Sequence, residues 1–336
     1  MSDEIHLAPA CKINDQVSMT NIQARSTKPA PLLLQTVLAL TAMLTNAAPV
    51  WAQVFQPGEI LVNQYVASSI QRYSASGSLL QTYTGTGTYW EGASLTPDGN
   101  LVTAYNDGLG NRGINIFNPA GSQIRTIPIN IYSFFGDISV FPNGTLAFND
   151  QYAGLQFWTQ TGAMLQTVSL PGLSQPLGST MGSDGILYVT GLLSNNIARV
   201  NSSGGLLGLI SLSFQPGDLV MNPLDNTFWI TGFSNHRVEH VNTDGTVLSS
   251  FATGLSGNFE GIGLALDNNS LYVASNGSNM VKHFDLNGNL LGSFNVAGPS
   301  SMLFLTVVPA ATPEPGSTML VLTSLALLAA HHRRRE

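Results

Sequence analysis

The stretch GIGLALDNNSLYVASNGSNMVKHFDLNGNLLGSF, from Gly261 to Phe294, decides the fold. It begins with alternating apolar residues, turns at Asp267-Asn268-Asn269 and continues into a second apolar segment, LYVAS. A polar loop leads to VKHFD, which is followed by a tight turn at Asn287-Gly288 and a last apolar segment. Short alternating runs bounded by Gly, Asn and Asp are typical of antiparallel strands. Four such strands in about forty residues match one blade of a β-propeller.

The same pattern recurs along the chain, and its copies give the number of blades. Each copy has a polar turn ending in glycine, with an apolar residue four positions before the glycine and an aliphatic residue three positions after it. The glycines are spaced 44, 41, 42, 41 and 43 residues apart: Gly77, Gly121, Gly162, Gly204, Gly245 and Gly288. The preceding column is Tyr73, Phe117, Trp158, Val200, Val241 and Phe284, and the following column is Leu80, Ile124, Leu165, Leu207, Leu248 and Leu291. We expect both columns to be buried, because the two strands of a hairpin would bury one face between neighbouring sheets. Glycine supplies the positive φ of the turn, and six copies predict six blades.

A second set of turns predicts how the ring closes. Turns such as Pro97-Asp98-Gly99 join the first strand of a blade to the second, and five of them occur. The chain enters at Gly58 with EILVN, which has the pattern of a second strand, and it ends with SMLFLTVV, a first strand without a successor. Leu303 to Val308 is therefore expected to pair with Ile60 to Asn63 in one blade, which removes two free sheet edges.

Composition supports a turn-rich all-β domain and disfavours several functional classes. Charged residues are 9% of the chain, Gly numbers 34, and the one cysteine, Cys11, precedes the expected export cleavage site. The mature chain would therefore hold no disulfide. Between Gln53 and Ala311 there are 6 basic and 14 acidic residues, a balance that disfavours a nucleic-acid surface. G-x-S-x-G, CxxC and HExxH motifs are absent from the sequence.

One blade resembles a known repeat. SNHRVEHVNTDG, from Ser234 to Gly245, is similar to the Asn-His-Leu signature of NHL-repeat propellers, with Arg237 and Val238 in place. The resemblance covers residues 57 to 309 and implies a six-bladed β-propeller, which we place at residues 53 to 309. It says little about function, because six-bladed propellers include enzymes, sugar-binding proteins and scaffolds.

Residues 1 to 52 have the pattern of a signal peptide with an N-terminal extension. Arg25 and Lys28 form a basic region, an apolar run follows from Leu32 to Leu44, and a small residue, Ala52, precedes a cleavage site before Gln53. A buried core helix is the alternative, disfavoured by two prolines at its entry. The pattern predicts export.

Residues 310 to 336 form a second targeting segment. The triplet Pro313, Glu314 and Pro315 precedes an apolar stretch from Met319 to Ala330, and Arg333, Arg334 and Arg335 follow. This order of spacer, short membrane helix and basic tail resembles the PEP-CTERM sorting signal of bacterial exported proteins. The resemblance implies cleavage near the triplet by a membrane enzyme of the exosortase type, and a place in the bacterial cell envelope, cell surface or extracellular matrix. An ordinary C-terminal anchor is the alternative, although the apolar stretch is shorter than the roughly 20 residues that span a bilayer.

The candidate binding site lies where the inner strands begin, since these positions ring one mouth of the channel in propellers. Aromatic platforms beside carboxylates suit a sugar, and the aromatic residues could instead fill gaps between blades. The predicted set is Trp90, Glu91, Phe134, Phe135, Asp137, Asp218, Phe259 and Glu260. We predict no catalytic residues.

Glu91-Gly92 and Glu260-Gly261 resemble the Glu-Gly that opens the first strand of gluconolactonase-like propellers. The resemblance implies that the glutamate helps to hold a divalent cation, and oxygen ligands would suit Ca²⁺. The partner Asn-Asp pair of that family is missing here, so no cofactor is the first expectation. The sequence therefore favours a glycan- or protein-binding module of unknown ligand. A metal-assisted hydrolase or lyase of the gluconolactonase-like or streptogramin-lyase-like kind is the alternative.

Overall fold

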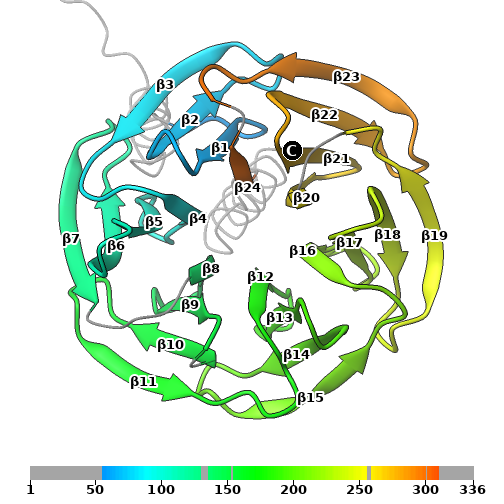
Figure 1. Ribbon diagram of the computed structural model, residues 1–336, viewed down its shortest axis with the longest axis horizontal. Coiled ribbons are helices and arrows are strands. Elements are labelled where there is room, and N and C mark those ends of the chain that lie inside the picture. Colours follow the sequence, from blue (N-terminus) through cyan, green and yellow to red (C-terminus); the bar gives the residue numbers. More distant parts are fainter. Residues whose placement is uncertain (1–54, 130–134, 153, 256–258, 300, 310–336) are drawn as a thin grey trace, which may run out of the picture. The chain divides into compact units, whose positions relative to one another are not determined.

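The computed structural model describes residues 55–129, 135–152, 154–255, 259–299 and 301–309 (Figure 1). These residues form six four-stranded antiparallel sheets, arranged as blades around a central channel (Figure 1). The predicted all-β, six-bladed propeller is confirmed. The described part of the chain has no helix long and apolar enough to span a bilayer. The predicted signal peptide and sorting signal lie outside the described residues.

Each blade contributes four strands, ordered from the channel outward. The first, inner strands are β4 (Trp90–Leu95), β8 (Phe135–Val140), β12 (Pro176–Met181), β16 (Pro216–Met221), β20 (Phe259–Asp267) and β24 (Met302–Val307). The second strands are β1 (Ile60–Gln64), β5 (Leu101–Asn106), β9 (Leu146–Asp150), β13 (Leu187–Gly191), β17 (Phe228–Gly232) and β21 (Ser270–Asn276). The third strands are β2 (Ser69–Tyr73), β6 (Arg112–Phe117), β10 (Gly154–Trp158), β14 (Asn196–Val200), β18 (Arg237–Val241) and β22 (Met280–Asp285). The outer strands are β3 (Leu79–Thr84), β7 (Gln123–Ile129), β11 (Met164–Val168), β15 (Leu206–Ser211), β19 (Val247–Ala252) and β23 (Leu290–Asn295).

The ring closes where the two ends of the propeller meet, as predicted. β24 is the inner strand of the blade that begins with β1, and the register pairs Ile60 with Val307 and Val62 with Leu305. The pairing continues beyond the strands, because Val308 N donates to Glu59 O at 2.8 Å and Gly58 N donates to Val308 O at 3.0 Å. One blade is therefore built from both ends of the domain.

The residues just before β1 add a second attachment to this blade. The guanidinium of Arg72 donates from Nε and Nη2 to the two carboxylate oxygens of Glu59, both at 2.8 Å. The same guanidinium lies 4.9 Å from the centre of the Phe55 ring, and this ring stacks on Tyr83. A buried two-point ion pair fixes orientation as well as distance. The entry segment is thus held by side chains in addition to strand pairing.

One of the two repeated columns is buried as predicted, and the other is not. The column Tyr73, Phe117, Trp158, Val200, Val241 and Phe284 is at most 9% exposed. The column Leu80, Ile124, Leu165, Leu207, Leu248 and Leu291 is 46 to 57% exposed, so the expectation of burial was wrong. In every blade this residue is the extra one of a β-bulge between the third and the outer strand. A bulged residue has no partner on the neighbouring strand, so its side chain points away from the face that the two strands bury together.

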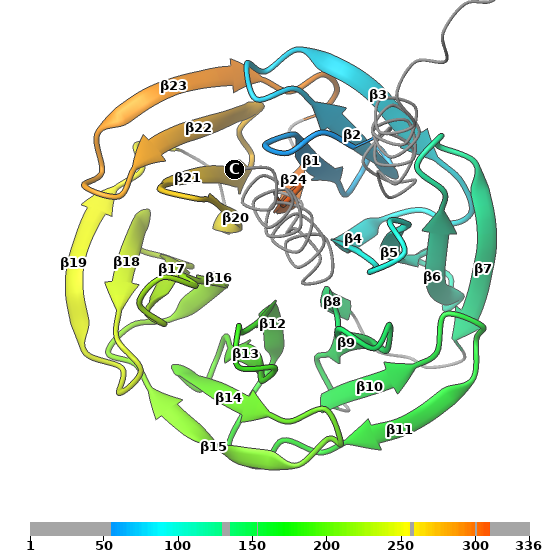
Figure 2. The ribbon, with the colours of Figure 1, turned by 180° about the vertical axis from the view of Figure 1, so that it is seen from behind.

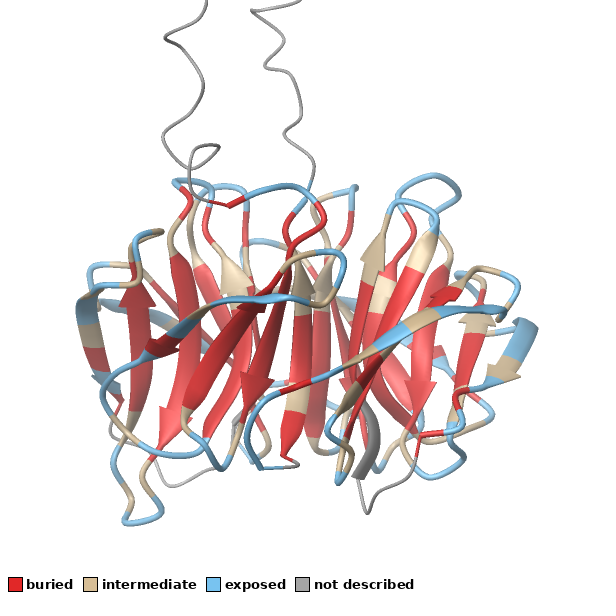
Figure 3. Ribbon diagram, turned by 90° about the horizontal axis from the view of Figure 1, so that it is seen from above, coloured by how far each residue is buried: buried red, intermediate tan, exposed pale blue. Residues whose placement is uncertain are grey.

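The core lies between adjacent blades (Figure 3), where buried residues follow the strands and exposed ones gather in the connections and on the outer strands. Polar side chains on the second strands also join each blade to the next. Asn149 Nδ2 donates to Leu177 O at 2.6 Å, and Thr190 Oγ1 donates to Gly217 O at 2.7 Å. Asn63 Nδ2 donates in the same way to Glu91 O. These bonds satisfy buried carbonyl groups that would otherwise be costly to desolvate.

Removing all residues after Ser300 should abolish cooperative folding. The truncation deletes β24, which buries Met302, Phe304 and Leu305, and each such side chain contributes roughly 1.5 to 3 kcal/mol. The total is comparable with the whole stability of many domains, about 5 to 15 kcal/mol. Truncation after Pro309, which keeps the strand, is the control. Chemical denaturation followed by circular dichroism measures both, and equal midpoints would refute the closure argument.

Candidate functional site

The site begins with a shared irregularity of the inner strands. Each inner strand has a break in its register near its start, such as that between Phe135 and Ile138 in β8 or between Pro216 and Leu219 in β16. One position at this break is shared by all six strands: it precedes the resumed pairing in five of them and begins it in β20, where Gly263 pairs with Ala274. Around the ring these residues are Gly92, Asp137, Gly178, Asp218, Gly263 and Phe304. Glycine therefore alternates with a larger residue.

The alternation has a steric cause. A Cβ atom at Gly92 would lie 2.2 Å from Asp137 Oδ1 and 2.5 Å from Asp137 Cα. A Cβ atom at Gly178 would lie 2.6 Å from Asp218 Cα. Each aspartate thus occupies space that the glycine of the preceding blade leaves open. Inner positions of closed β-structures commonly alternate small and large residues for this reason.

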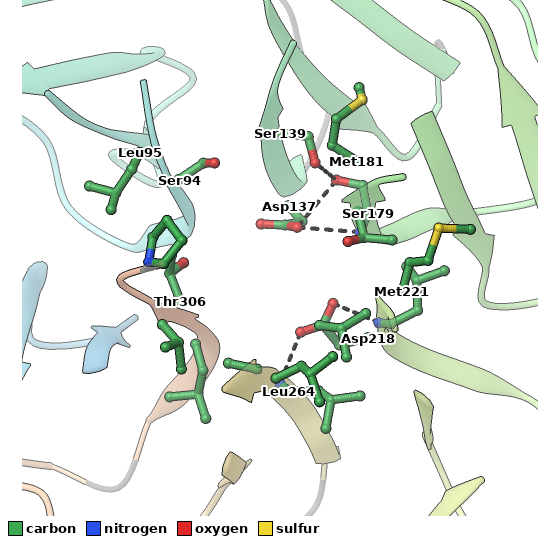
Figure 4. Close-up of a pocket in the computed structure, with 18 of the residues that line it drawn as sticks. Ser94, Leu95, Asp137, Ser139, Ser179, Met181, Asp218, Met221, Leu264 and Thr306 are labelled. Carbon is green, nitrogen blue, oxygen red and sulfur yellow. Dashed lines mark hydrogen bonds between the residues drawn. The ribbon is translucent and has the colours of Figure 1, made fainter. Parts of the chain in front are cut away.

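Both aspartates accept the same two main-chain hydrogen bonds, and Asp137 accepts a third from a hydroxyl group. Asp137 Oδ1 accepts from Ile138 N at 2.8 Å, and Asp137 Oδ2 accepts from the main chain and hydroxyl of Ser179 at 3.3 and 3.2 Å. Asp218 Oδ1 accepts from Leu219 N at 2.8 Å, and Asp218 Oδ2 accepts from Leu264 N at 3.0 Å. Each carboxyl group therefore joins its own inner strand to that of the following blade (Figure 4).

Burial changes the acidity of this pair. The exposed fractions of Asp137 and Asp218 are 8% and 3%. Desolvation raises the pKa of Asp137 to about 7, and hydrogen bonds from Ile138 and Ser179 oppose the rise. Desolvation also raises the pKa of Asp218 well above 3.8, and the negative charge of Asp137 raises it further. Asp137 is therefore protonated in a large part of the molecules near neutral pH, and a carboxyl group in that form can donate as well as accept hydrogen bonds.

The two aspartates lie at the wall of a central cavity of about 550 Å³, lined by the inner strands of all six blades (Figure 4). Hydroxyl groups come from Ser94, Ser139, Ser179, Thr180 and Thr306. Apolar surface comes from Leu95, Val140, Met181, Met221, Leu266 and Val307. The lining continues to Asp267, Asn268, Pro223 and Pro309, at the ends of the inner strands. Cavities of this size, mostly apolar with a few polar groups, are typical of small-ligand sites.

Apolar side chains gather at the other end of the channel, where the inner strands begin. Phe304, from the strand that closes the ring, is buried in a cluster with Leu177 and Leu192, against which Phe233 and Leu303 pack. Phe304 thereby holds the ring position that aspartate has in two other blades. The described side chains of this cluster are all apolar.

The predicted site residues separate into three groups. Asp137 and Asp218 line the cavity together. Trp90 is 0% exposed, packs on Phe117 and donates from Nε1 to Thr86 O and Gly87 O at 3.2 and 3.3 Å. It fills a gap between blades and offers no face to a ligand. Glu91 is buried outside the cavity lining and accepts from Asn106 Nδ2 at 2.9 Å.

The structure does not test the remaining predicted site residues. Phe134 and the sorting-signal residues lie outside the described residues, as do the side chains of Phe135, Phe259 and Glu260. Among the described side chains, no group of three or more His, Cys, Asp and Glu residues could hold a metal ion. The Ca²⁺ expectation at Glu91 and Glu260 therefore stays a prediction.

Sequence reasoning missed the serines of the cavity and the place of Phe304. Ser139 Oγ lies 2.9 Å from Ser179 Oγ, which extends the hydrogen bonds of Asp137 across two blades. The alternation of glycine with Asp137, Asp218 and Phe304 appears when the inner strands are aligned on Leu95, Val140, Met181, Met221, Leu266 and Val307. Such an alignment requires knowing where the pairing of each inner strand with the second strand is interrupted.

The histidines lie away from the cavity. His240 stacks on Trp229 at 4.2 Å between ring centres, and His283 stacks on Tyr272 at 4.1 Å. Burial lowers the pKa of both imidazoles. Each ring packs across the second and third strands of its own blade.

Comparisons with known proteins support the fold. No known family and no curated protein matches the sequence. A functionally unknown protein from Desulfotomaculum acetoxidans DSM 771 is 20% identical, with a TM-score of 0.58, over 77% of this chain and 88% of that one. A catalytically inactive virginiamycin B lyase from Staphylococcus aureus, solved with quinupristin, is 18% identical, with a TM-score of 0.55, over 75% and 86%. A chain of the nidogen/laminin complex is 17% identical, with a TM-score of 0.62, over 74% and 97%. At these identities the likeness shows the fold alone.

Asp137→Asn should flatten the pH dependence of stability. The pKa of Asp137 is raised in the folded chain, so its stabilisation is complete below about pH 4 and is lost as the pH rises towards 7. Between pH 5 and pH 8 the wild-type free energy of unfolding should fall more than that of the variant. The difference should be at most about 3 kcal/mol, since one pKa unit corresponds to about 1.36 kcal/mol.

Urea denaturation at several pH values measures this difference. Asp98→Asn, in an exposed turn, removes the same charge at the surface and is the control. Parallel pH profiles for Asp137→Asn and the wild type would show that Asp137 titrates normally.

Proposed function

We propose that this protein is a binding module whose central cavity holds part of a neutral, hydroxyl-rich ligand, such as a sugar unit of a polysaccharide. The observation that carries the proposal is the pair Asp137 and Asp218 at the wall of a cavity of about 550 Å³. Both acids have a raised pKa. The proposal relies on the cavity formed by described residues, and the aromatic mouth predicted at Phe134, Phe135 and Phe259 stays a prediction.

The chemistry of the lining favours a neutral ligand. Carboxyl groups that keep a proton near neutral pH can donate to one ligand hydroxyl and accept from another. An anionic ligand would place a further negative charge beside groups that burial already keeps from ionising. The apolar surface of Leu95, Met181 and Met221 can cover the CH face of a sugar ring. A polar loop of a surface protein offers similar groups and is the alternative guest.

A hydrolase or lyase is the second candidate. A carboxyl group with a pKa of about 7 is suited to general acid–base catalysis, and virginiamycin B lyase is among the proteins that share the fold. The hydrogen bonds of the acids weigh against this function. Both oxygens of Asp137 and of Asp218 accept from main-chain amides of the inner strands, which ties these groups to the structure of the channel.

Ser94→Trp should weaken binding. Ser94 lines the cavity and is partly exposed (Figure 4), so an indole there would fill space needed by a ligand. We expect a screen of neutral polysaccharides, with and without Ca²⁺, to identify a ligand whose affinity falls at least about tenfold in this variant, a change of about 1.4 kcal/mol. Ala120→Trp, in an exposed turn, should bind as the wild type does.

Three outcomes would change the assignment. Full binding by Ser94→Trp would place the site outside the channel. Binding that needs Ca²⁺ and is lost in Glu91→Gln would favour the cation predicted from the resemblance. Steady turnover of a lactone that Asp137→Asn abolishes would favour the enzyme.

We also propose that the chain is exported and sorted to the bacterial envelope or matrix by an exosortase-type enzyme. The sequence patterns of residues 1–52 and 310–336 carry this proposal. The closure of the ring supports it, because Gly58 and Val308 are bonded to each other at the boundary of the propeller. Removal of both flanking segments would therefore leave every described strand intact.

Mature protein from the native envelope should begin near Gln53 and should lack the residues that follow Pro315. Intact-mass measurement compares this species with the unprocessed chain. Glu314→Gln keeps the length and polarity of the triplet, and the comparison with the wild type shows whether the carboxylate is recognised. A dominant species that still carries Arg333 to Arg335 would identify the segment as a plain membrane anchor.

A further inference from the structure

A second cavity lies between two adjacent blades. Its volume is about 360 Å³, and its lining comes from the blade of β12 to β15 and the blade of β16 to β19, which stand side by side in the ring (Figures 1 and 2). Arg199 in its lining is half-buried. The other lining residues are buried Tyr188, Ile210 and Met221 and exposed Asp184, Asn226 and Thr243. The cavity thus extends from the surface into the packed space between the blades.

Arg199 supplies the positive charge of this cavity. Its guanidinium lies beside the hydroxyl of Tyr188, with which it pairs across β13 and β14. The Tyr188 hydroxyl donates to Asp184 Oδ2 at 2.8 Å, and Asp184 Oδ1 accepts from Ile186 N at 3.0 Å. Burial and the neighbouring carboxylate raise the pKa of Tyr188 to about 12, so its hydroxyl keeps its proton. Among the described residues, no ion pair joins Arg199 to a carboxylate.

Other blades show what a side chain at this position binds. Arg72 has the same place as Arg199, one residue before the buried column, and its guanidinium holds both carboxylate oxygens of Glu59 at 2.8 Å. His240 has this place in the blade of β16 to β19, and its Nε2 lies 2.7 Å from Thr227 Oγ1. Glu59 and Thr227 each directly precede the second strand of their blade. The partner therefore comes from the same place in both blades.

The corresponding places around Arg199 carry no such partner. Ile186 directly precedes β13, where the first blade has its carboxylate. Gly208 pairs with Arg199, whereas Gln81 pairs with Arg72 and lies 3.5 Å from its Nη1. A Cβ atom at Gly208 would have no other atom within 4 Å. Arg199 therefore lacks both groups that bind the guanidinium in the first blade, and open space adjoins its partner on the outer strand.

We propose that the cavity between these blades, which we call the interblade site, binds the carboxylate of an acidic sugar such as a hexuronic acid. The ligand carboxylate takes the place at Arg199 that Glu59 has at Arg72, because the planar guanidinium matches a carboxylate with two hydrogen bonds. Asp184 can accept further hydrogen bonds from sugar hydroxyl groups. A doubly charged phosphate is disfavoured, since it would lie close to the same Asp184 carboxylate. The volume suits a small ligand.

The interblade site is distinct from the central cavity. Of their described lining residues the two cavities share Met221 alone. The central cavity presents the buried acids Asp137 and Asp218, whereas the interblade site presents an arginine. The inference therefore goes beyond the proposed function and does not depend on the ligand proposed there.

Arg199→Gln should weaken the binding of glucuronate at least about tenfold, the loss expected when a charge-assisted hydrogen bond is removed. Isothermal titration calorimetry of the full chain with sodium glucuronate measures this change. Glucose has the same ring with a CH₂OH group in place of the carboxylate, and it should bind the wild type at least about tenfold more weakly than glucuronate. Arg125→Gln removes the same charge from an exposed residue of β7 and should bind glucuronate as the wild type does.

A second pair of variants tests the comparison with Arg72. Ile186→Glu introduces a carboxylate where the first blade has Glu59, so this side chain should pair with Arg199 and exclude glucuronate. Ile186→Gln has nearly the same shape without the charge and should retain binding. The melting temperature of Ile186→Glu should be no lower than that of Ile186→Gln, because the new carboxylate gains a partner.

Several results would overturn the proposal. Equal affinity of the wild type and Arg199→Gln for glucuronate would do so, as would equal affinity of the wild type for glucuronate and glucose. Loss of glucuronate binding in Ser94→Trp would place the carboxylate in the central cavity. Tighter binding of a peptide that ends in glutamate would assign the interblade site to a protein partner instead of a sugar.

Discussion

The antiparallel pairing of β1 with β24 is the contact on which the rest of the ring depends. Each blade buries its two faces against the two neighbouring blades. The blade formed by both ends of the propeller completes this ring of contacts. Closing a loop of this length costs about 5 kcal/mol of chain entropy. Burial of Met302, Phe304 and Leu305 contributes roughly 1.5 to 3 kcal/mol for each side chain. These magnitudes are similar, so the ion pair of Arg72 with Glu59 adds stability where the balance is narrow.

Closure also determines the chemistry of the channel. Six inner strands converge on one axis, and side chains at the level of their bulges compete for the same space. Glycine at 92 and 178 makes room for Asp137 and Asp218, and the carboxyl groups use main-chain amides of the next blade as donors. The bonds offset part of the cost of burial but leave the pKa of both acids raised. A structural solution to crowding thus produces a pair of acids with raised pKa values, that of Asp137 being raised to about 7.

The fold could be predicted from the sequence because its signals are local and repeated. Turn glycines such as Gly77, with φ of 82°, have the backbone conformation expected of them, and six copies at regular spacing define the blades. The outward direction of Leu80 could not be predicted from the same repeat. One extra residue in a strand reverses the face of the sheet to which the side chains beyond it point. The alternation of apolar and polar residues in the sequence does not reveal where such an extra residue is inserted. Similarly, Trp90 begins an inner strand as predicted, yet its side chain turns into the gap between blades rather than into the channel.

The candidate site was harder to predict because it is built from residues that are far apart in the sequence. Asp137 and Asp218 are 81 positions apart, and neither lies in a recognisable motif. Their environment depends on Ser179 and Leu264 from the blades that follow, and on glycines from the blades that precede. Only the closed ring brings these groups together. The cavity is therefore a property of the assembled ring, because its lining comes from the inner strands of all six blades and no single blade contains it.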